Sequence, residues 1–177
     1  GVTVSQTAGL PSNTAFPVGA TTCTFRATDA SGNSTTCSFV ATVVDNIAPT
    51  ITCPSNVSAN AATGTCAATV SYALPTGSDN CPGTTGSILS GSAPGSSFPV
   101  GTTTNTFQLA DAAGNTATCS FNVVVVDAEL PAITCPGNVT VNNATGSCSA
   151  TATFVAPVGT DNCGGVTTAQ TGGLPSG

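Results

Sequence analysis

Short stretches in which apolar, β-branched side chains alternate with small polar ones recur along the chain. The alternation is found at residues 21–27, 67–74 and 102–109, and the runs at 37–44, CSFVATVV, and 119–126, CSFNVVVV, are apolar and β-branched. Turn-forming Gly, Asn, Pro and Asp residues separate them, which is typical of short β-strands. No stretch keeps the 3.6-residue spacing of an amphipathic helix. The pattern therefore predicts an all-β protein.

The predicted strands belong to a repeat of 82 residues. Residues 16–54 and 98–136 align without an insertion, so that Cys37 corresponds to Cys119 and 119 − 37 = 82. The sequence VTVSQTAGLPS near the N-terminus also resembles VTTAQTGGLPS near the C-terminus, at twice this offset. A repeat of this length is a small independent domain and not a solenoid unit. We expect one complete domain at residues 48–129, the C-terminal part of a domain at 1–47, and the N-terminal part of another at 130–177.

The order of the strands in the complete repeat indicates an immunoglobulin-like domain. The expected strands lie at residues 50–59, 66–74, 87–97, 102–109 and 119–126. Short strands separated by turns in this way form an antiparallel β-sandwich. Phe98, Phe107 and Phe121 are expected in its core, because the chain has few aromatic residues. A domain of this size has a thin core, so we expect disulfides to contribute to its stability.

The composition is poor in charge and excludes several classes of function. The chain has one basic residue, Arg26, seven acidic residues and no His, Met or Trp. Nucleic acid is a poor partner, because phosphate binding needs clustered Lys or Arg. No apolar run reaches the roughly 20 residues of a membrane span, and the lack of a signal peptide and an initiator Met indicates a mature or internal fragment. Without His or a catalytic pair of carboxylates, the sequence predicts no enzyme.

Nine cysteines that recur in register, in a chain without His, indicate the disulfide framework of an exported protein. A zinc site is disfavoured because there is no C-x2-C pair. The complete repeat contains four cysteines, which allow three pairings. The first and last strands of the sandwich run side by side, which favours a bond between their cysteines. The favoured set is therefore Cys53–Cys119, Cys66–Cys81 and, by repetition, Cys148–Cys163.

Under this scheme Cys37 and Cys135 have no partner within the chain. We expect them to pair across repeats or chains, either in a longer continuous polypeptide or between subunits that complete each other's domains by strand complementation. The alternative is an arbitrary boundary with two ragged ends, which would leave an exposed strand edge. Cys23 corresponds to Asn105 in the next repeat. Either a buried thiol or a crosslink would explain it.

The seven acidic residues lie in turns and junctions. The domain order would bring Asp45 together with Asp79 and Asp111 at one pole, and Asp127 with Asp161 at the equivalent pole. These five are candidate Ca²⁺ ligands, because Ca²⁺ takes roughly 6–8 oxygen ligands from carboxylates, amides and carbonyls. The alternative is that Asp and Asn side chains stabilise local turns such as DASGN and DAAGN. The sequence leaves both interpretations open.

Four N-x-S/T sequons are candidate glycosylation sites, at Asn33, Asn56, Asn138 and Asn143. Chance matches are frequent in a chain so rich in Asn and Thr. The sequons therefore mark positions to examine and do not establish a modification.

Several short motifs occur together in the chain: PTITCP, GTC, DNC, FPVGT, and DASGN followed by TCSF. In combination they resemble the hyalin repeat (HYR) module, and the resemblance covers essentially the whole chain. It implies an extracellular, immunoglobulin-like adhesion domain that occurs in tandem arrays and has no known catalysis. Cys23 is a departure from the repeated pattern.

We therefore expect a secreted or cell-surface structural protein, forming a fibre, stalk or filament of tandem disulfide-stabilised domains. Its expected partners are neighbouring copies of itself or further repeats of the same chain. The alternative is a cell-surface adhesin module that binds carbohydrate or a protein through variable loops. Residues 84–97 and the corresponding residues 1–15 differ most between the repeats and would hold such a binding surface.

Overall fold

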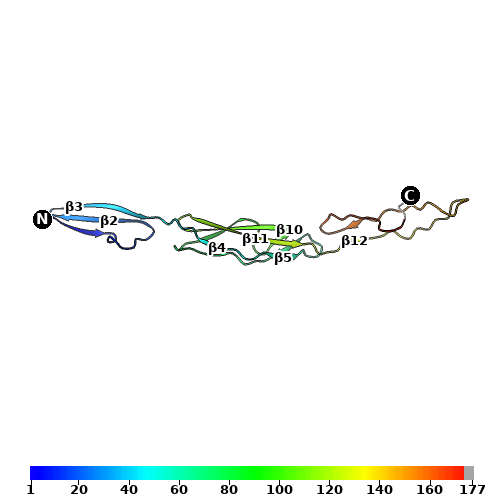
Figure 1. Ribbon diagram of the computed structural model, residues 1–177, viewed down its shortest axis with the longest axis horizontal. Helices are drawn as coiled ribbons and strands as arrows, with labels where there is room; N and C mark the ends of the chain where they lie inside the picture. Colours follow the sequence, from blue (N-terminus) through cyan, green and yellow to red (C-terminus); the bar gives the residue numbers. More distant parts are fainter. Residues whose placement is uncertain (174–177) are drawn as a thin grey trace. The chain divides into compact units, whose positions relative to one another are not determined.

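The computed structural model describes residues 1–173 of the chain (Figure 1). These residues form thirteen β-strands and no helix, which confirms the all-β prediction. The strands are β1 (Thr3–Ala8), β2 (Gly19–Thr28), β3 (Ser34–Val43), β4 (Thr50–Thr52), β5 (Val57–Asn60), β6 (Ala67–Val70), β7 (Thr76–Ser78), β8 (Thr85–Ser90), β9 (Ser96–Pro99), β10 (Gly101–Ala110), β11 (Thr116–Val126), β12 (Ala132–Ile133) and β13 (Gly159–Thr160). In this part of the chain no helix has the length and apolarity needed to cross a membrane.

Two compact units divide the chain. The first holds Gly1–Ile51, Gly77–Ser87 and Gln108–Thr118, and the second holds Thr52–Thr76, Ile88–Phe107 and the described residues from 119 onward. This division runs through the middle repeat and does not follow the repeat boundaries. The domain boundaries expected from the sequence therefore stay a prediction.

The 82-residue repeat reappears strand by strand. The strands β1, β2 and β3 form an antiparallel sheet in that order, and their equivalents 82 residues later are β8, β10 and β11. The short strands β4 and β7 pair with each other, and so do their equivalents β12 and β13. The residues before β4 thus form late strands of the repeat, and the residues after β11 form early strands.

The main sheet of the middle repeat has the order β5-β11-β10-β8. In this sheet β5 runs parallel to β11, with Val57 opposite Val123 and Asn60 opposite Val126. This pair is an exception to the antiparallel sandwich expected from the sequence. It is possible because five strands and their turns lie between β5 and β11 in the sequence, and parallel partners need a long connection. The strands β6 and β9 form a separate two-stranded antiparallel sheet.

Four aromatic rings form the centre of the second unit. Phe98, Phe107 and Phe121 are at most 5% exposed, as expected for core residues. Tyr72 lies edge-on against all three, with ring centroids 6.4, 6.2 and 4.8 Å away. Edge-to-face packing is favourable because the positive rim of one ring meets the negative face of the other. The Tyr72 hydroxyl donates a hydrogen bond to the Ser92 carbonyl oxygen, and burial raises the pKa of Tyr72.

A disulfide joins Cys53, which follows β4, to Cys119 in β11. This is the bond that the sequence favoured, between the first and last strands of the repeat. The two residues are 66 positions apart in the sequence. Closing a loop of this length removes conformational freedom from the unfolded chain, which in the chain-entropy account stabilises the fold by about 4 kcal/mol.

Cys23 takes the place of a buried asparagine. Cys23 is 2% exposed and its equivalent Asn105 is fully buried. The Oδ1 atom of Asn105 accepts a hydrogen bond from the Ser92 N–H at 2.7 Å. The Sγ atom of Cys23 lies 3.8 Å from the carbonyl oxygen of Leu10, the equivalent of Ser92. Both side chains therefore lie under the same loop, which supports the buried thiol and not the crosslink.

Replacing Cys53 and Cys119 together by Ala is expected to lower the free energy of unfolding by about 4 kcal/mol, because the unfolded chain regains the freedom that the bond removes. Urea denaturation of the 177-residue chain measures this change. The control is Cys37→Ser, which alters an exposed free thiol and should change the free energy by less than about 0.5 kcal/mol. Equal effects of the two changes would contradict the stabilising role of the bond.

Candidate functional site

The two D-x-x-G-N motifs form the same closed turn. The Oδ1 atom of Asp29 accepts hydrogen bonds from the N–H groups of Ser31 and Asn33 at 2.9 and 2.8 Å, and its Oδ2 atom accepts one from the Asn33 side chain at 2.9 Å. Asp111 is bonded in the same way within DAAGN. The side chain of Asn33 and then the backbone N–H groups lower the pKa of Asp29. Burial raises the pKa of Asp111, but hydrogen bonds outweigh this effect and the pKa is lowered.

The side chain of Asn115 joins this turn to the junction that precedes β4. Its amide donates hydrogen bonds to the carbonyl oxygens of Asp45 at 3.1 Å and Ile47 at 3.3 Å, and to Asp111 Oδ2 at 2.7 Å. Asp111 therefore positions Asn115, and Asn115 holds the junction. The sequence reasoning placed Asp111 at this pole but missed Asn115, although the G-N pair repeated in both motifs was the signal for it.

Asp45 and Asp79 lie together with Cys81 at this pole. One carboxylate oxygen from each Asp and the Cys81 Sγ lie within 4.8 Å of one another. Asp45 Oδ1 accepts the Ile47 N–H at 3.1 Å, and Asp79 Oδ2 accepts the Cys81 N–H at 2.9 Å. The hydrogen bond to the Asp45 carboxylate raises the pKa of the Cys81 thiol, and so do burial and the charges of Asp45, Asp79 and Asp111.

The same arrangement recurs 82 residues later with Asp127, Asp161 and Cys163. Their ligand atoms again lie within 4.8 Å of one another. Asp127 Oδ1 accepts the Glu129 N–H at 3.1 Å, and Asp161 Oδ1 accepts the Cys163 N–H at 2.9 Å. The structure thus brings together four of the five predicted metal ligands in two pairs, and it adds a cysteine to each pair.

These two groups fit calcium poorly. Calcium takes roughly 6–8 hard oxygen ligands, whereas each group offers two carboxylates, each with one oxygen already bonded to a backbone N–H, and a sulfur. Sulfur is a soft ligand that calcium does not favour. The fifth predicted ligand, Asp111, is held in its own turn. Calcium binding stays a prediction.

The cysteine of the second group is bonded to the preceding repeat. A disulfide joins Cys163 to Cys66, with 5.0 Å between their Cα atoms and a sequence separation of 97. The structure therefore differs from the expected pairs Cys66–Cys81 and Cys148–Cys163, and both Cys81 and Cys148 carry free thiols. The sequence missed this bond because its two cysteines belong to successive repeats. The register of a repeat gives no sign of which turns meet at a junction.

Two hydrogen bonds accompany this disulfide at the GTC turn. The side-chain amide of Asn162 donates to the Thr65 carbonyl oxygen at 2.8 Å. In the linker between the repeats, Glu129 Oε2 accepts the N–H of Gly64 at 2.7 Å. The GTC turn of the middle repeat therefore contacts both the linker and the DNC turn that follows it.

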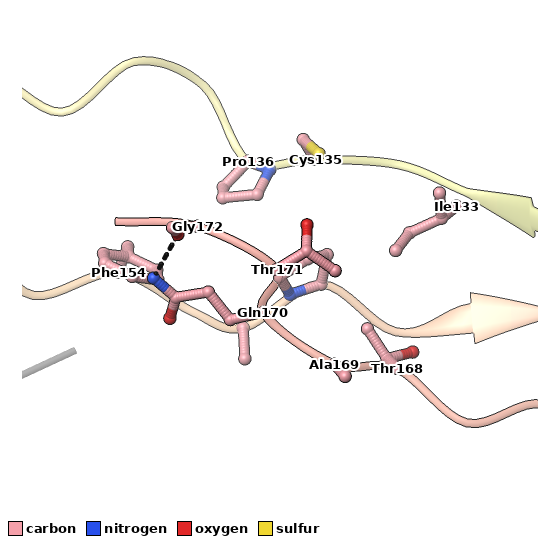
Figure 2. Close-up of a pocket in the computed structure, with 11 residues that line it drawn as sticks. Ile133, Cys135, Pro136, Phe154, Thr168, Ala169, Gln170, Thr171 and Gly172 are labelled. Atoms are coloured by element: carbon pink, nitrogen blue, oxygen red, sulfur yellow. Dashed lines mark hydrogen bonds between the residues drawn. The ribbon is translucent and has the colours of Figure 1, made fainter. Parts of the chain in front are cut away.

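An open groove of about 490 Å³ lies among residues 130–173 (Figure 2). Figure 2 shows Ile133, Cys135 and Pro136 on one segment of its wall and residues 168–172 on another. Cys135 is exposed and carries a free thiol, as does Cys37 on β3. The ring of Phe154, the equivalent of Tyr72, also lines the groove. The structure leaves Cys37 and Cys135 available for the pairing across repeats or chains that the sequence predicted, which stays a prediction.

The four sequon asparagines, Asn33, Asn56, Asn138 and Asn143, are exposed. The amide nitrogen of Asn33 is bonded to Asp29 at 2.9 Å, and that of Asn143 to the Ser147 carbonyl oxygen at 2.7 Å. A glycan would attach through this nitrogen and would change these bonds. Glycosylation stays a prediction at all four positions.

Asp45→Asn is expected to speed alkylation of the Cys81 thiol at pH 8. The substitution removes the largest cause of the raised pKa of Cys81, so a larger fraction of the thiol becomes the reactive thiolate. Mass spectrometry of the peptide that carries Cys81 measures the rate with iodoacetamide. Asp29→Asn is the matched control, because Asp29 does not contribute to the shift, and it should leave the rate unchanged. A slower reaction in Asp45→Asn would contradict the assignment.

The family model of the HYR domain matches residues 1–43 and 44–125. The chain is 37% identical to hyalin of Strongylocentrotus purpuratus and 36% identical to hyalin of Lytechinus variegatus, each over 156 residues and 84% of this chain. It spans only 13% and 29% of the length of these two relatives.

The matches agree with the structure in two respects. Two tandem matches account for residues 1–125 of the 177, and the strands of the chain repeat at the same spacing. The matched sequences are those that carry the GTC, DNC and D-x-x-G-N turns of the middle repeat. The chain therefore belongs to the HYR domain family.

Proposed function

We propose that this protein is a structural component of an extracellular fibre in which HYR domains follow one another head to tail. Its family makes it an extracellular, adhesion-type repeat protein, and nothing in the described residues points to catalysis. The observation that supports a fibre is that core positions buried in the middle repeat are exposed in the residues on either side of it. Neighbouring copies would bury them.

The aromatic core shows this difference most clearly. Phe121 is 4% exposed, whereas its equivalent Phe39 is 56% exposed. Phe25 and Phe39 stack with their ring centroids 6.2 Å apart, as the equivalent pair in the middle repeat does at 6.0 Å. The ring that corresponds to Tyr72 is Phe154, which lines the open groove (Figure 2). Bringing these rings together would bury apolar surface worth about 1.5–3 kcal/mol for each fully buried Phe.

The strand edges are complementary as well. In the middle repeat β5 lies along the end of β11. The equivalent of β5, residues 139–142, forms no strand, and the sheet β1-β2-β3 has no fourth strand beside β3 in the described chain. Val139 and Val141 are 49% and 47% exposed. An open strand edge is a template for pairing with another chain, so residues 139–142 would add to β3 of the next copy.

The two exposed cysteines fit the same arrangement. Cys37 is the equivalent of Cys119, and Cys135 is the equivalent of Cys53. Seating β2 and β3 of a following copy in the groove would place Cys37 beside Cys135, as Cys119 lies beside Cys53 in the middle repeat. The partner is thus a second copy of this chain or a further repeat of the same polypeptide.

Phe39→Ala is expected to abolish or strongly weaken assembly while changing the stability of the isolated chain little, because Phe39 is mostly exposed there. Its matched control is Phe121→Ala at the equivalent buried position, which should lower the free energy of unfolding by about 3–5 kcal/mol. Electron microscopy and non-reducing gels measure assembly, and urea denaturation measures stability. Wild-type chains that stay monomeric under oxidising conditions would overturn the fibre and favour the adhesin alternative.

A further inference from the structure

The disulfide between Cys66 and Cys163 joins two positions that occur in every repeat, so an equivalent bond can form at every junction between repeats. Its sequence separation of 97 equals 82 + 15, and 81 − 66 = 15. The bond therefore joins the GTC cysteine of one repeat to the DNC cysteine of the next repeat. Cys148, in the sequence GSC, is the equivalent of Cys66 in the next repeat, and Cys81 is the preceding DNC cysteine. Both are free.

We propose that Cys66–Cys163 is one instance of a covalent staple that recurs at each junction, and that Cys148 of one copy of the chain bonds to Cys81 of the next copy. The inference rests on the proposed function, because it takes the partner to be a second copy placed head to tail. It adds a bond between domains to the bonds within them.

The turn that carries Cys148 already has the shape of the bonded turn. Before Cys66, the N–H of Ala62 bonds to the Ala67 carbonyl at 2.8 Å, and the N–H of Thr65 bonds to the Ala62 carbonyl at 2.9 Å. The equivalent bonds around Cys148 run from Ala144 to Ser149 at 2.9 Å and from Ser147 to Ala144 at 2.9 Å. Cys148 is exposed at the end of this preformed turn.

The turn that carries Cys81 matches that of Cys163 in the same way. In each D-N-C turn the cysteine N–H bonds to the Asp carboxylate at 2.9 Å. The Asn amide lies 3.3 Å from the sulfur of Cys81 and 3.4 Å from that of Cys163. In the bonded turn this amide also reaches the Thr65 carbonyl. Asn80 is therefore oriented to bond the Ser147 carbonyl of the preceding copy.

The staple explains the number of cysteines. With Cys66–Cys163 and Cys53–Cys119 inside each chain, and Cys148–Cys81 and Cys135–Cys37 between chains, every cysteine except Cys23 has a partner. Cys23 is 2% exposed and takes the place of Asn105 in the core, so it is too buried to join the disulfide scheme. Four disulfides and this one buried thiol account for the nine cysteines.

The covalent step is thiol–disulfide exchange. The thiols of Cys148 and Cys81 lose two protons and two electrons as one S–S bond forms. An external disulfide, such as oxidised glutathione, accepts them as its own S–S bond breaks and becomes two thiols. Two successive exchanges through a mixed disulfide complete the reaction.

Cleavage before each Asp under non-reducing conditions tests the inference, because it separates the cysteines that matter. The fragments are 1–28 with Cys23, 29–44 with Cys37, 45–78 with Cys53 and Cys66, 79–110 with Cys81, 111–126 with Cys119, 127–160 with Cys135 and Cys148, and 161–177 with Cys163. Chains oxidised with glutathione should give one cluster of 45–78, 111–126 and 161–177. A second cluster should join 127–160 to 29–44 and 79–110.

Two other results separate failure of the staple from failure of the fibre. A disulfide between fragments 45–78 and 79–110, together with one between 127–160 and 161–177, would mean that Cys66 pairs with Cys81 and Cys148 with Cys163, which would overturn the staple. A remaining disulfide between 127–160 and 29–44 would still support the fibre. Free thiols on 29–44, 79–110 and 127–160 would overturn the fibre and the bond between copies together.

A pair of variants tests the bond between copies without Cys135. Cys135→Ser chains should still form disulfide-linked multimers through Cys148 and Cys81 on a non-reducing gel. The double variant Cys135→Ser/Cys81→Ser should lose them, although it keeps Cys37 and Cys148. Multimers of equal yield in the two variants would overturn the assignment of Cys81 as the partner. Loss of multimers in both variants would overturn the staple between copies.

Discussion

The packing of Tyr72 against three phenylalanines is the interaction on which the middle repeat depends. The chain has only seven Phe and one Tyr, and four of these eight aromatic residues meet in this cluster. Tyr72 follows the early strand β6, whereas Phe107 and Phe121 lie in β10 and β11. The cluster therefore closes a domain only where early and late strands meet.

Much of this architecture could be predicted from the sequence, because it follows from periodicity. Alternation located the long strands, the scarcity of aromatic residues marked the core, and the strand order gave Cys53–Cys119. The parallel pairing of β5 and β11 was missed, because alternation shows which residues face the core but not the direction of a neighbouring strand. The interpretation of Cys23 needed the structure, since its role depends on the loop above Asn105.

The junctions were the least predictable part. The sequence placed Asp45 and Asp79 at a common pole, and the structure brings them together. It could not show that Asp111 is used by its own turn, because a carboxylate in a turn and a carboxylate in a metal site have the same spacing in sequence. The pairing of Cys66 with Cys163 was hidden for a related reason. Contacts between successive domains depend on how their poles meet, and a repeat unit analysed alone contains only one side of each contact.

The Cys53–Cys119 bond has a mechanical consequence. A pulling force along the polypeptide passes through two sulfur atoms at this point and bypasses the loop of 66 positions between them. If the repeat continues, only the segment from one bond to the next, such as Cys119 to Cys135 (135 − 119 = 16), can lengthen. At about 3.4 Å per residue this segment reaches roughly 55 Å, against roughly 280 Å for an unbonded repeat. A series of such domains would therefore resist extension under force, because most of each repeat cannot unravel.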